Sequence, residues 1–431
     1  MRILVLSDEV WNDKINGNNV VSNWFEDFDA EFANIYLSPE KPYNSCCSRY
    51  FQVTDIMMLK SIFSLSKAGH SFEISLDKEG YYDDRLDGDQ VKLYAFLKSI
   101  SGNTMRVLRE VLWSAGKYDI SALKKFVLDF NPDIIFTERL ASNKILRLER
   151  IICSITSCPI VAFTGDDEYS LKQLNFSPLY WLNRFILRKN LKKNVQKYSI
   201  YYTLSEEQKA YYEKEFGCKA KILHKCGTTS DEFIPHNLNA PIKIVYAGKL
   251  YCNRWKVLAS LASGIKKINK TGQKFILLIY TKDKITSKQE KLLNDGCNSM
   301  LMGSVTQEKL KKIYDDSDIA LHVESQDIKN RLLTRFSFST KIVDCINSGC
   351  AVMAICWEQH SGYTYLKKEK AAFCIPNESN ILLTLERIAN NPNIIEKYAK
   401  KAWECAQRNH NKEKIQQMLF KDFTETINND K

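Results

Sequence analysis

The sequence predicts an α/β protein with two doubly wound domains that face each other across a cleft. The chain has 431 residues, which is enough for two domains with separate cores. Short runs rich in β-branched residues alternate with helical patterns, as is typical of parallel βα units. This alternation stops at a connector that contains proline and asparagine, and it restarts after the connector.

The first domain is expected to span residues 1–228. A helix is expected to begin after Gly17, and a long helical insertion is expected around residues 80–130. Ser205 and Gln208 have capping-box spacing, and Gly217 is expected to end the helix that they begin. Six apolar runs that end in polar residues or glycine are expected to form strands: Arg2–Asp8, Phe32–Ser38, Asp133–Arg139, Pro159–Gly165, Tyr198–Ser205 and Ala220–Lys225.

Residues 229–241 form the expected linker, and residues 242–395 form the expected second domain. Helices are expected to begin at Thr306 and Thr340. The polar helical tail, residues 396–431, is expected to pack on the outside or to cross back to the first domain. The expected strands are Ile242–Gly248, Lys274–Thr281, Ser299–Gly303, Asp318–Glu324, Ala351–Ile355 and Ala372–Ile375.

The composition indicates an ordinary globular protein. Apolar residues make up 44% and charged residues 26%, which excludes a disordered or fibrous chain. The 13 cysteines include no C-x-x-C pair and no zinc-ligand spacing, so we expect buried thiols in a reducing cytosol. The first apolar run is too short for a signal peptide, and no run is long enough to cross a bilayer. We therefore expect a cytoplasmic protein, either soluble or peripheral on the inner face of the plasma membrane.

Positive charge is concentrated in one segment. The formal net charge is +11, and residues 171–200 contain basic residues but no acid. Within that segment, residues 179–193 interleave aromatic and aliphatic side chains with Arg and Lys at helical spacing. This pattern fits an interfacial helix on an anionic membrane, and it fits a core helix with an exposed basic face equally well. No RRM, KH or helix-turn-helix signature accompanies the charge, so no nucleic-acid partner is expected.

The segment that begins at Ser339 has the residue types of a diphosphate site. Ser339 and Thr340 stand where a helix begins, and Lys341 lies in its first turn. Free N–H groups, hydroxyls and an ammonium would converge there on an anion. Asp344, one turn later, is placed to meet sugar hydroxyls. The alternative is a plain N-cap followed by a solvated lysine.

An ordered series of motifs resembles the nucleotide-sugar-binding half of GT-B glycosyltransferases. The resemblance is to the group 1, family 4-like members of bacterial surface polysaccharide biosynthesis. It covers the second domain well and the first only in outline. The motifs are Tyr246-Ala-Gly-Lys-Leu, Arg254 with Lys256, Gly303-Ser-Val, Asp318-Ile-Ala-Leu-His, Ser339-Thr-Lys-Ile-Val-Asp344 and Ser348-Gly-Cys-Ala-Val.

The resemblance implies two Rossmann-like domains and a role for several residues. Gly248 and Lys249 would form the turn beside the donor, and Arg254 and Lys256 would neutralise the diphosphate leaving group without a metal. The backbone at Val305 would meet the base, and Asp344 would take the ribose hydroxyls. Phe336 departs from the pattern, because many retaining members have a glutamate there.

Other candidate residues follow from their positions. His322 lies in an expected strand, where it would touch the donor or serve as a core residue. Gly17 follows the first strand and would bring the backbone close to the donor phosphate or the acceptor, or simply enter a helix. Three acids at strand ends are candidates for a general base: Glu138, Asp166 and Asp167. We select Asp166, because Gly165 before it allows the backbone to approach a ligand closely.

Together these observations predict a glycosyltransferase of the hexosyltransferase type. It would move a sugar from a nucleoside-diphosphate sugar to a glycan acceptor on a polyprenyl carrier, in bacterial cell-surface polysaccharide biosynthesis. A nucleotide-sugar epimerase and a non-catalytic nucleotide- or nucleic-acid-binding protein remain as alternatives. The sequence contains no G-x-S-x-G, Walker A or H-E-x-x-H motif, so it gives no support to hydrolases or kinases of those types.

Overall fold

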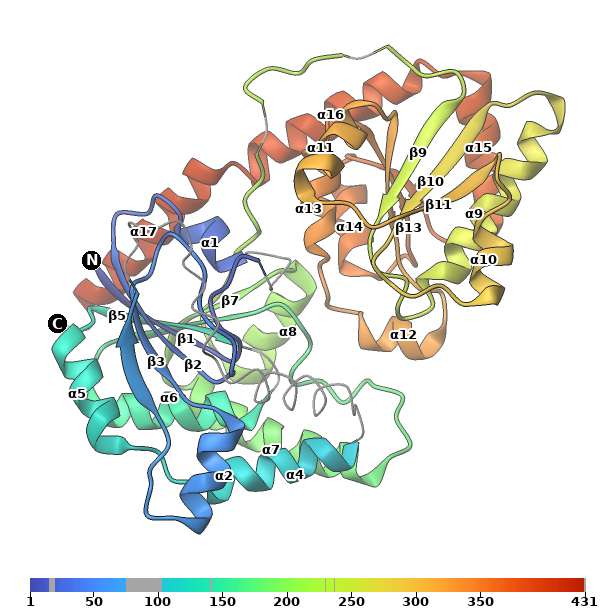
Figure 1. Cartoon of the computed structure of the whole chain (residues 1–431). Helices are drawn as coiled ribbons and strands as arrows, with labels where there is room; N and C mark the ends of the chain where they lie inside the picture. The colour runs from blue at the N-terminus through green and yellow to red at the C-terminus, as the bar shows by residue number, and fades with distance from the viewer. Residues whose placement is uncertain (15–19, 75–102, 140–141, 229, 236, 430–431) are drawn as a thin grey trace. The chain divides into compact units, whose positions relative to one another are not determined.

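The computed structural model describes residues 1–14, 20–74, 103–139, 142–228, 230–235 and 237–429 (Figure 1). The chain divides into two compact units. The first unit comprises residues 1–171, 175–223 and 413–431, and the second comprises residues 172–174 and 224–412. The expected site residue Gly17 lies outside the described residues.

The first unit is built on an eight-stranded sheet with the order β4-β3-β2-β1-β5-β6-β7-β8. Every neighbouring pair is parallel except β3 with β4. The strands are β1 (Arg2–Ser7), β2 (Glu31–Tyr36), β3 (Arg49–Gln52), β4 (His70–Glu73), β5 (Ile134–Arg139), β6 (Ile160–Thr164), β7 (Tyr198–Thr203) and β8 (Ala220–Ile222).

All six strands predicted for the first domain are confirmed, with ends that differ by at most three residues. The sequence analysis missed β3 and β4, which are four residues each and form one margin of the sheet. β4 is mostly exposed and β3 begins at an exposed arginine, so neither strand has the continuous apolar run of a buried parallel strand.

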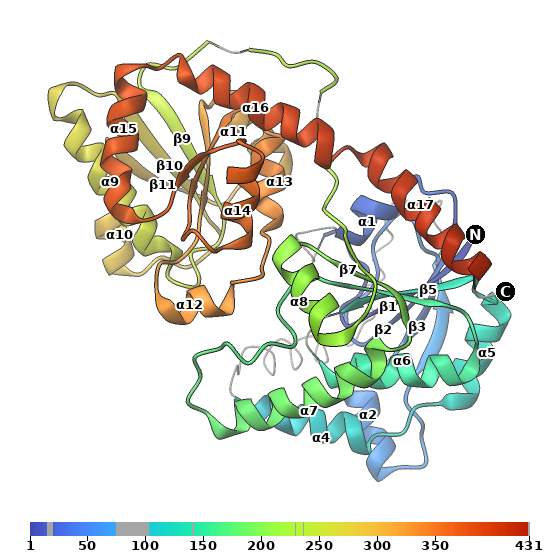
Figure 2. The ribbon, with the colours of Figure 1, turned by 180° about the vertical axis from the view of Figure 1, so that it is seen from behind.

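Helices cover both faces of the first sheet. In Figures 1 and 2, α4, α6 and α7 lie on one face, and α1 and α17 lie on the other. The predicted cap of α8 is confirmed: Ser205 accepts a hydrogen bond from the Gln208 amide, and Gly217 ends the helix with a φ of 63°. Part of the predicted insertion, residues 80–102, lies outside the described residues. The helices are α1 (Val20–Phe25), α2 (Asp55–Phe63), α4 (Asn103–Ala115), α5 (Ile120–Phe130), α6 (Asn143–Ile155), α7 (Pro178–Val195), α8 (Glu206–Phe216) and α17 (Lys412–Asn429).

The second unit is built on a six-stranded, fully parallel sheet with the order β11-β10-β9-β12-β13-β14. All six strands predicted for this domain are confirmed. Except for β11 at the edge, they are largely buried, which explains their continuous apolar runs. The strands are β9 (Ile242–Ala247), β10 (Phe275–Tyr280), β11 (Ser299–Gly303), β12 (Ile319–Val323), β13 (Ala351–Ile355) and β14 (Phe373–Ile375).

Helices also cover both faces of the second sheet, with α9, α10 and α15 on one side and α11, α13 and α14 on the other (Figures 1 and 2). The helix starts predicted at Thr306 and Thr340 are confirmed within one residue. None of the helices in the described part of the chain combines the length and the apolar character that crossing a bilayer needs. The helices are α9 (Arg254–Ile268), α10 (Ser287–Leu293), α11 (Gln307–Asp315), α12 (Ile328–Leu333), α13 (Thr340–Ile346), α14 (Ser361–Lys368), α15 (Ile381–Asn390) and α16 (Ile394–Asn409).

The C-terminal helix α17 belongs to the core of the first unit. Phe423 is fully buried, and its ring lies 6.4 Å from that of Phe25 and 6.2 Å from that of Phe136. The neighbouring Asp422 accepts a hydrogen bond of 2.9 Å from the Tyr202 hydroxyl and forms an ion pair with Lys221. The tail therefore crosses back to the first domain, the second of the two expected arrangements.

We expect Phe423→Ala to destabilise the protein by about 3–5 kcal/mol, because it leaves a cavity in an aromatic cluster. Urea unfolding monitored by circular dichroism measures the change. Phe420→Ala on the same helix is the control, because 43% of the Phe420 side chain is exposed. Equal losses in the two variants would show that α17 does not contribute its buried face to the core.

Candidate functional site

The candidate site lies in the second unit, at the carboxyl ends of β9 and β12. The turn between β9 and α9 contains two non-glycine residues in the left-handed region, Cys252 with a φ of 54° and Asn253 with a φ of 59°. Two hydrogen bonds connect this turn to the segment that follows β12. The Asn253 amide donates to Asp327 at 2.6 Å, and the Asn330 amide donates to the Cys252 carbonyl at 2.9 Å. These bonds place the first residue of α9, Arg254, beside the end of β12.

Arg254 forms a buried ion pair with Glu324. Its guanidinium donates two hydrogen bonds to the Glu324 carboxylate, at 3.0 and 2.5 Å, and both side chains are less than 10% exposed. Burial alone would raise the pKa of Glu324, but the charge of the Arg254 guanidinium, together with its hydrogen bonds, outweighs that effect and lowers the pKa. The sequence analysis expected Arg254 to face a diphosphate. The structure shows its charge balanced by Glu324, an acid that the sequence analysis did not select.

Lys341 brings an ammonium to the turn after β9. A Cβ atom built on Gly248 would lie 1.8 Å from the Lys341 Nζ, so the lysine occupies the space that glycine leaves open. The Nζ also lies 5.5 Å from the centre of the Tyr246 ring. Among the described residues, none forms a hydrogen bond or an ion pair with this ammonium. Burial, and then the charge of Arg254, lower the pKa of Lys341 to about 8. The lysine is therefore still cationic at neutral pH.

Two histidines lie beside the ion pair. His322 is 3% exposed, and its Nε2 lies 3.7 Å from Glu324. Within the described part of the chain, this Nε2 has no hydrogen-bond partner. Burial lowers the pKa of His322 to about 3, so the imidazole is neutral. The His360 ring lies 6.3 Å away, and its Nδ1 accepts a hydrogen bond of 3.1 Å from the Gly362 amide.

The other predicted donor residues lie around this centre. Lys256 pairs with Asp327 at 3.3 Å, and Lys249 is exposed. Ser339 is the N-cap of α13 but its side chain makes no capping hydrogen bond, and Thr340 begins the helix. Asp344 forms an ion pair of 2.7 Å with Lys225. Val305 is half-buried between β11 and α11. The structure therefore brings Gly248, Arg254, His322 and Lys341 together, whereas Lys256 and Asp344 are bound to other side chains.

The acids proposed as general bases lie in the first unit and have different surroundings. The side chain of Asp166 is exposed, and its carbonyl accepts a hydrogen bond of 2.8 Å from Gln208. Asp167 is buried and accepts hydrogen bonds from Ser170 and from Arg184, the latter at 3.2 Å. Asp167 therefore stabilises the loop that follows β6. Glu138 is half-buried at the end of β5.

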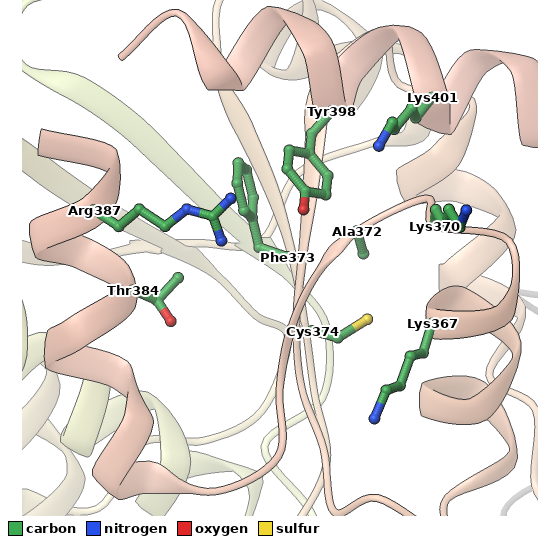
Figure 3. A pocket seen from close by; sticks show the side chains of 9 residues that line it. All are labelled: Lys367, Lys370, Ala372, Phe373, Cys374, Thr384, Arg387, Tyr398 and Lys401. Atoms are coloured by element: carbon green, nitrogen blue, oxygen red, sulfur yellow. The ribbon is translucent and has the colours of Figure 1, made fainter. Parts of the chain in front are cut away.

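A separate basic pocket of about 320 Å³ lies at the edge strand β14 (Figure 3). Its lining comes from the carboxyl-terminal end of α14, from β14 and from the helices α15 and α16. Its lining residues are Lys367, Lys370, Ala372, Phe373, Cys374, Thr384, Arg387, Tyr398 and Lys401. Among the described residues, no three or more His, Cys, Asp or Glu side chains are grouped so that they could hold a metal ion.

Comparison with solved structures shows the GT-B fold. The chain is similar over 99% of its length to sucrose-phosphate synthase from Thermosynechococcus elongatus, with 13% identity, a TM-score of 0.61 and 99% of that chain covered. It is similar over 99% of its length to a glycosyltransferase from Rickettsia africae ESF-5, with 11% identity, a TM-score of 0.59 and 98% covered. A third similar structure, from E. coli, is described as trehalose-6-phosphate bound with UDP-2-fluoro glucose, with 10% identity, 98% of this chain and 99% of that chain covered, and a TM-score of 0.59. No protein-family model and no curated protein matches the sequence.

The lowered pKa of Lys341 predicts a pH-dependent contribution to stability. An unfolded lysine titrates near 10.5 and the folded Lys341 near 8, so between these values the unfolded state binds more protons. The free energy of unfolding should therefore rise with pH in this window, and Lys341→Met should lose that rise. Urea unfolding of both proteins at pH 7.5, 8.5 and 9.5 measures the difference. A difference that is constant with pH would contradict the lowered pKa.

Proposed function

From the GT-B fold, we propose that this chain is a glycosyltransferase that moves a hexose-type sugar from a nucleoside-diphosphate sugar to a glycan. One observation carries the proposal: the ammonium of Lys341 lies partly buried against Gly248 without an acidic partner among the described residues. It does so at the carboxyl ends of parallel strands, where ligands of such sheets bind. A desolvated cation is stabilised by an anion, and a diphosphate is the anion that this reaction releases.

Lys341 has the main electrostatic role in this proposal. As the bond between the sugar and the diphosphate breaks, negative charge grows on the leaving group, and a cation placed beforehand lowers the barrier. Arg254 acts through its pair with Glu324, which positions the turn between β9 and α9 and keeps that region electrically balanced. Lys249 and Lys256 add positive charge at the rim. We propose that these cations neutralise the diphosphate without a metal.

The remaining proposed contacts to the donor come from α13, from β12 and from the segment after β11. The N–H groups at Ser339 and Thr340 face the phosphate, and the backbone at Val305 meets the base. Asp344, which Lys225 holds at 2.7 Å, accepts from the ribose hydroxyls. His322 offers to the sugar its neutral Nε2, which has no hydrogen-bond partner among the residues that the structure describes. The E. coli structure described as bound with UDP-2-fluoro glucose supports this choice of donor class.

We propose further that the acceptor is a polyprenyl-linked glycan of bacterial surface polysaccharide synthesis, reached at the cytoplasmic face of the membrane. One face of α7 supports this location. Its amino-terminal half exposes apolar side chains, and its carboxyl-terminal half exposes lysines at positions that share the same face. Residues 171–200 contain no acid. These side chains are Leu179, Leu182, Phe185, Ile186, Lys189, Lys192 and Lys193.

The opposite face of α7 packs in the first unit. Leu187 and Leu191 are buried, and Arg184 is paired with Asp167 at 3.2 Å, so Arg184 does not contribute free charge. The exposed face thus combines apolar area with three lysines, which is the chemistry of a helix at an anionic lipid surface. Each basic residue near such a surface contributes about 1 kcal/mol.

The donor site is tested by a thermal-shift panel of UDP, GDP, ADP and dTDP. We expect one diphosphate to stabilise the protein, by about 2.7 kcal/mol at 100 times its dissociation constant. Lys341→Ala should lose this effect, and Gly248→Ala should weaken it, because a Cβ at this position displaces the lysine. Lys267→Ala, an exposed lysine of α9, is the matched control. No response to any nucleotide would contradict the proposed function, and stabilisation without transfer to a polyprenyl-lipid extract would favour a binding protein.

The membrane surface is tested by sedimentation with lipid vesicles. We expect binding to vesicles that contain anionic phospholipid and little binding to phosphatidylcholine alone. Replacing Lys189, Lys192 and Lys193 by glutamine should weaken binding by roughly 100-fold. The same replacement of three exposed lysines of α11 (Lys309, Lys311 and Lys312) removes equal charge elsewhere and is the control. Equal losses in the two triple variants would show that α7 is not the binding surface.

A further inference from the structure

Four cationic side chains surround the pocket of about 320 Å³ at the edge strand β14 (Figure 3). They are Lys367 in the last turn of α14, Lys370 just after that helix, Arg387 in the last turn of α15, and Lys401 of α16. No acid lines the pocket. Among the described residues, none forms an ion pair or a side-chain hydrogen bond with any of these cations. Their charges are therefore available to an anion.

The pocket is separate from the candidate donor site in the same unit. β13 stands between β14 and β12, the strand whose carboxyl end carries Glu324. Lys367 lies at the far end of α14 from His360, about 10 Å away along the helix axis. None of the residues that line the pocket belongs to the donor site. The diphosphate that we propose beside Lys341 therefore does not account for the four cations.

The dipoles of the helices explain only part of this charge. Lys367 and Arg387 lie in the last turns of their helices, where a cation is favourable in any protein. Lys401 lies in the middle of α16, so it complements no helix end. Its side chain is half-buried, and its ammonium lies 5.1 Å from the centre of the Tyr398 ring. An aromatic contact thus holds this charge at the pocket.

Lys370 has a backbone conformation that favours glycine. Its φ is 55°, in the left-handed region. Its amide donates to the Lys367 carbonyl at 3.2 Å, and the Ala371 amide donates to the Leu366 carbonyl at 3.0 Å. Glycine has the lowest steric cost at such a helix end, and a lysine there reduces stability. A strained residue of this kind is expected where its side chain serves a ligand.

The middle of the pocket is apolar. The rings of Phe373 and Tyr398 lie 3.9 Å apart, and Ala372 adds a methyl group. In Figure 3, Arg387 lies on one side of the two rings and the three lysines lie on the other. The volume exceeds what one phosphate ion needs and falls in the range of pockets for small organic ligands. Lysine and arginine are the side chains that bind phosphate groups.

We propose that this pocket binds a small organic molecule with two phosphate groups. The three lysines bind one phosphate group, and Arg387 binds the other. The carbon skeleton between the two groups lies against the rings of Phe373 and Tyr398. The proposal goes beyond the proposed glycosyltransferase function and does not depend on it, because the pocket shares no residue with the donor site.

The test is isothermal titration calorimetry with fructose 1,6-bisphosphate, glucose 6-phosphate and inorganic phosphate as probes. We expect the bisphosphate to bind most tightly and inorganic phosphate least tightly. The double variant Lys370→Gln, Lys401→Gln should weaken binding of the bisphosphate by roughly 100-fold, because it removes two charge-assisted contacts. Lys309→Gln, Lys311→Gln in α11 removes equal charge from exposed positions and should bind as the wild type does.

Lys370→Gly separates the ligand contact from the fold. We expect it to raise the melting temperature by roughly 2–4 °C, because glycine relieves the left-handed strain, and to weaken binding of the bisphosphate by roughly tenfold. A destabilised structure cannot explain weaker binding by a more stable variant. Full binding by this variant and by the double variant would overturn the assignment of the pocket.

Lys341→Ala distinguishes this site from the donor site. It should leave binding of the bisphosphate unchanged, while it removes the thermal shift by the nucleoside diphosphate. Loss of bisphosphate binding in Lys341→Ala would place the probe in the donor site and overturn the inference, with the proposed function intact. Binding of the bisphosphate no tighter than that of inorganic phosphate would overturn the two-phosphate ligand. Unchanged bisphosphate binding without a thermal shift by any nucleotide would contradict only the proposed function.

Discussion

The buried pair of Arg254 and Glu324 is the interaction on which the candidate donor site depends. It joins the first residue of α9 to the end of β12, and it lies beside a turn whose left-handed residues Cys252 and Asn253 need support from outside the turn. Removing one partner of a buried ion pair typically costs about 3–5 kcal/mol, because the other charge remains buried.

The charges of this pair also change the pKa values of neighbouring side chains. Arg254 lowers the pKa of Lys341, and Glu324 opposes the much larger effect of burial on His322. This salt bridge therefore supports the turn, and its arginine lowers the pKa of Lys341, whereas burial keeps His322 neutral.

The sequence predicted the parallel strands well because burial on both faces requires continuous apolar runs, as in β12 and β13. It missed β3 and β4, whose short and partly exposed segments lack that pattern. It placed Lys341 at the start of a helix, but the contact with Gly248 joins residues 93 positions apart and depends on tertiary structure. The ion pair of Arg254 was also not predictable from the sequence, because its partner Glu324 is 70 residues away. An acid at the end of a buried strand was the available signal for Glu324, and the sequence analysis used this signal only in the first domain, where it selected Glu138, Asp166 and Asp167.

The two units shift their key titratable groups in opposite directions by the same physical cause. Burial lowers the pKa of Lys341 to about 8 and raises that of Glu138 to about 7, because in each case it disfavours the charged form. Neighbouring charges of like sign add to the effect, Arg254 for the lysine and Glu9 and Asp8 for the glutamate. A cation that is costly to bury gains most when an anion arrives, and a carboxylate that is costly to ionise gains most when it takes a proton. The first of these two effects is the one that the proposed transfer from a diphosphate donor would use.

The position of α17 bears on how the chain can be divided. Cutting the sequence at the linker would give a first fragment, residues 1–228, that lacks Asp422 and Phe423. Without them, Tyr202 and Lys221 lose a buried carboxylate partner, and Phe25 and Phe136 lose an aromatic neighbour. A fully buried phenylalanine and a satisfied buried carboxylate are worth several kcal/mol together, which is comparable to the net stability of a domain. The first unit is therefore completed by residues 413–429, and its fold needs these residues to be stable.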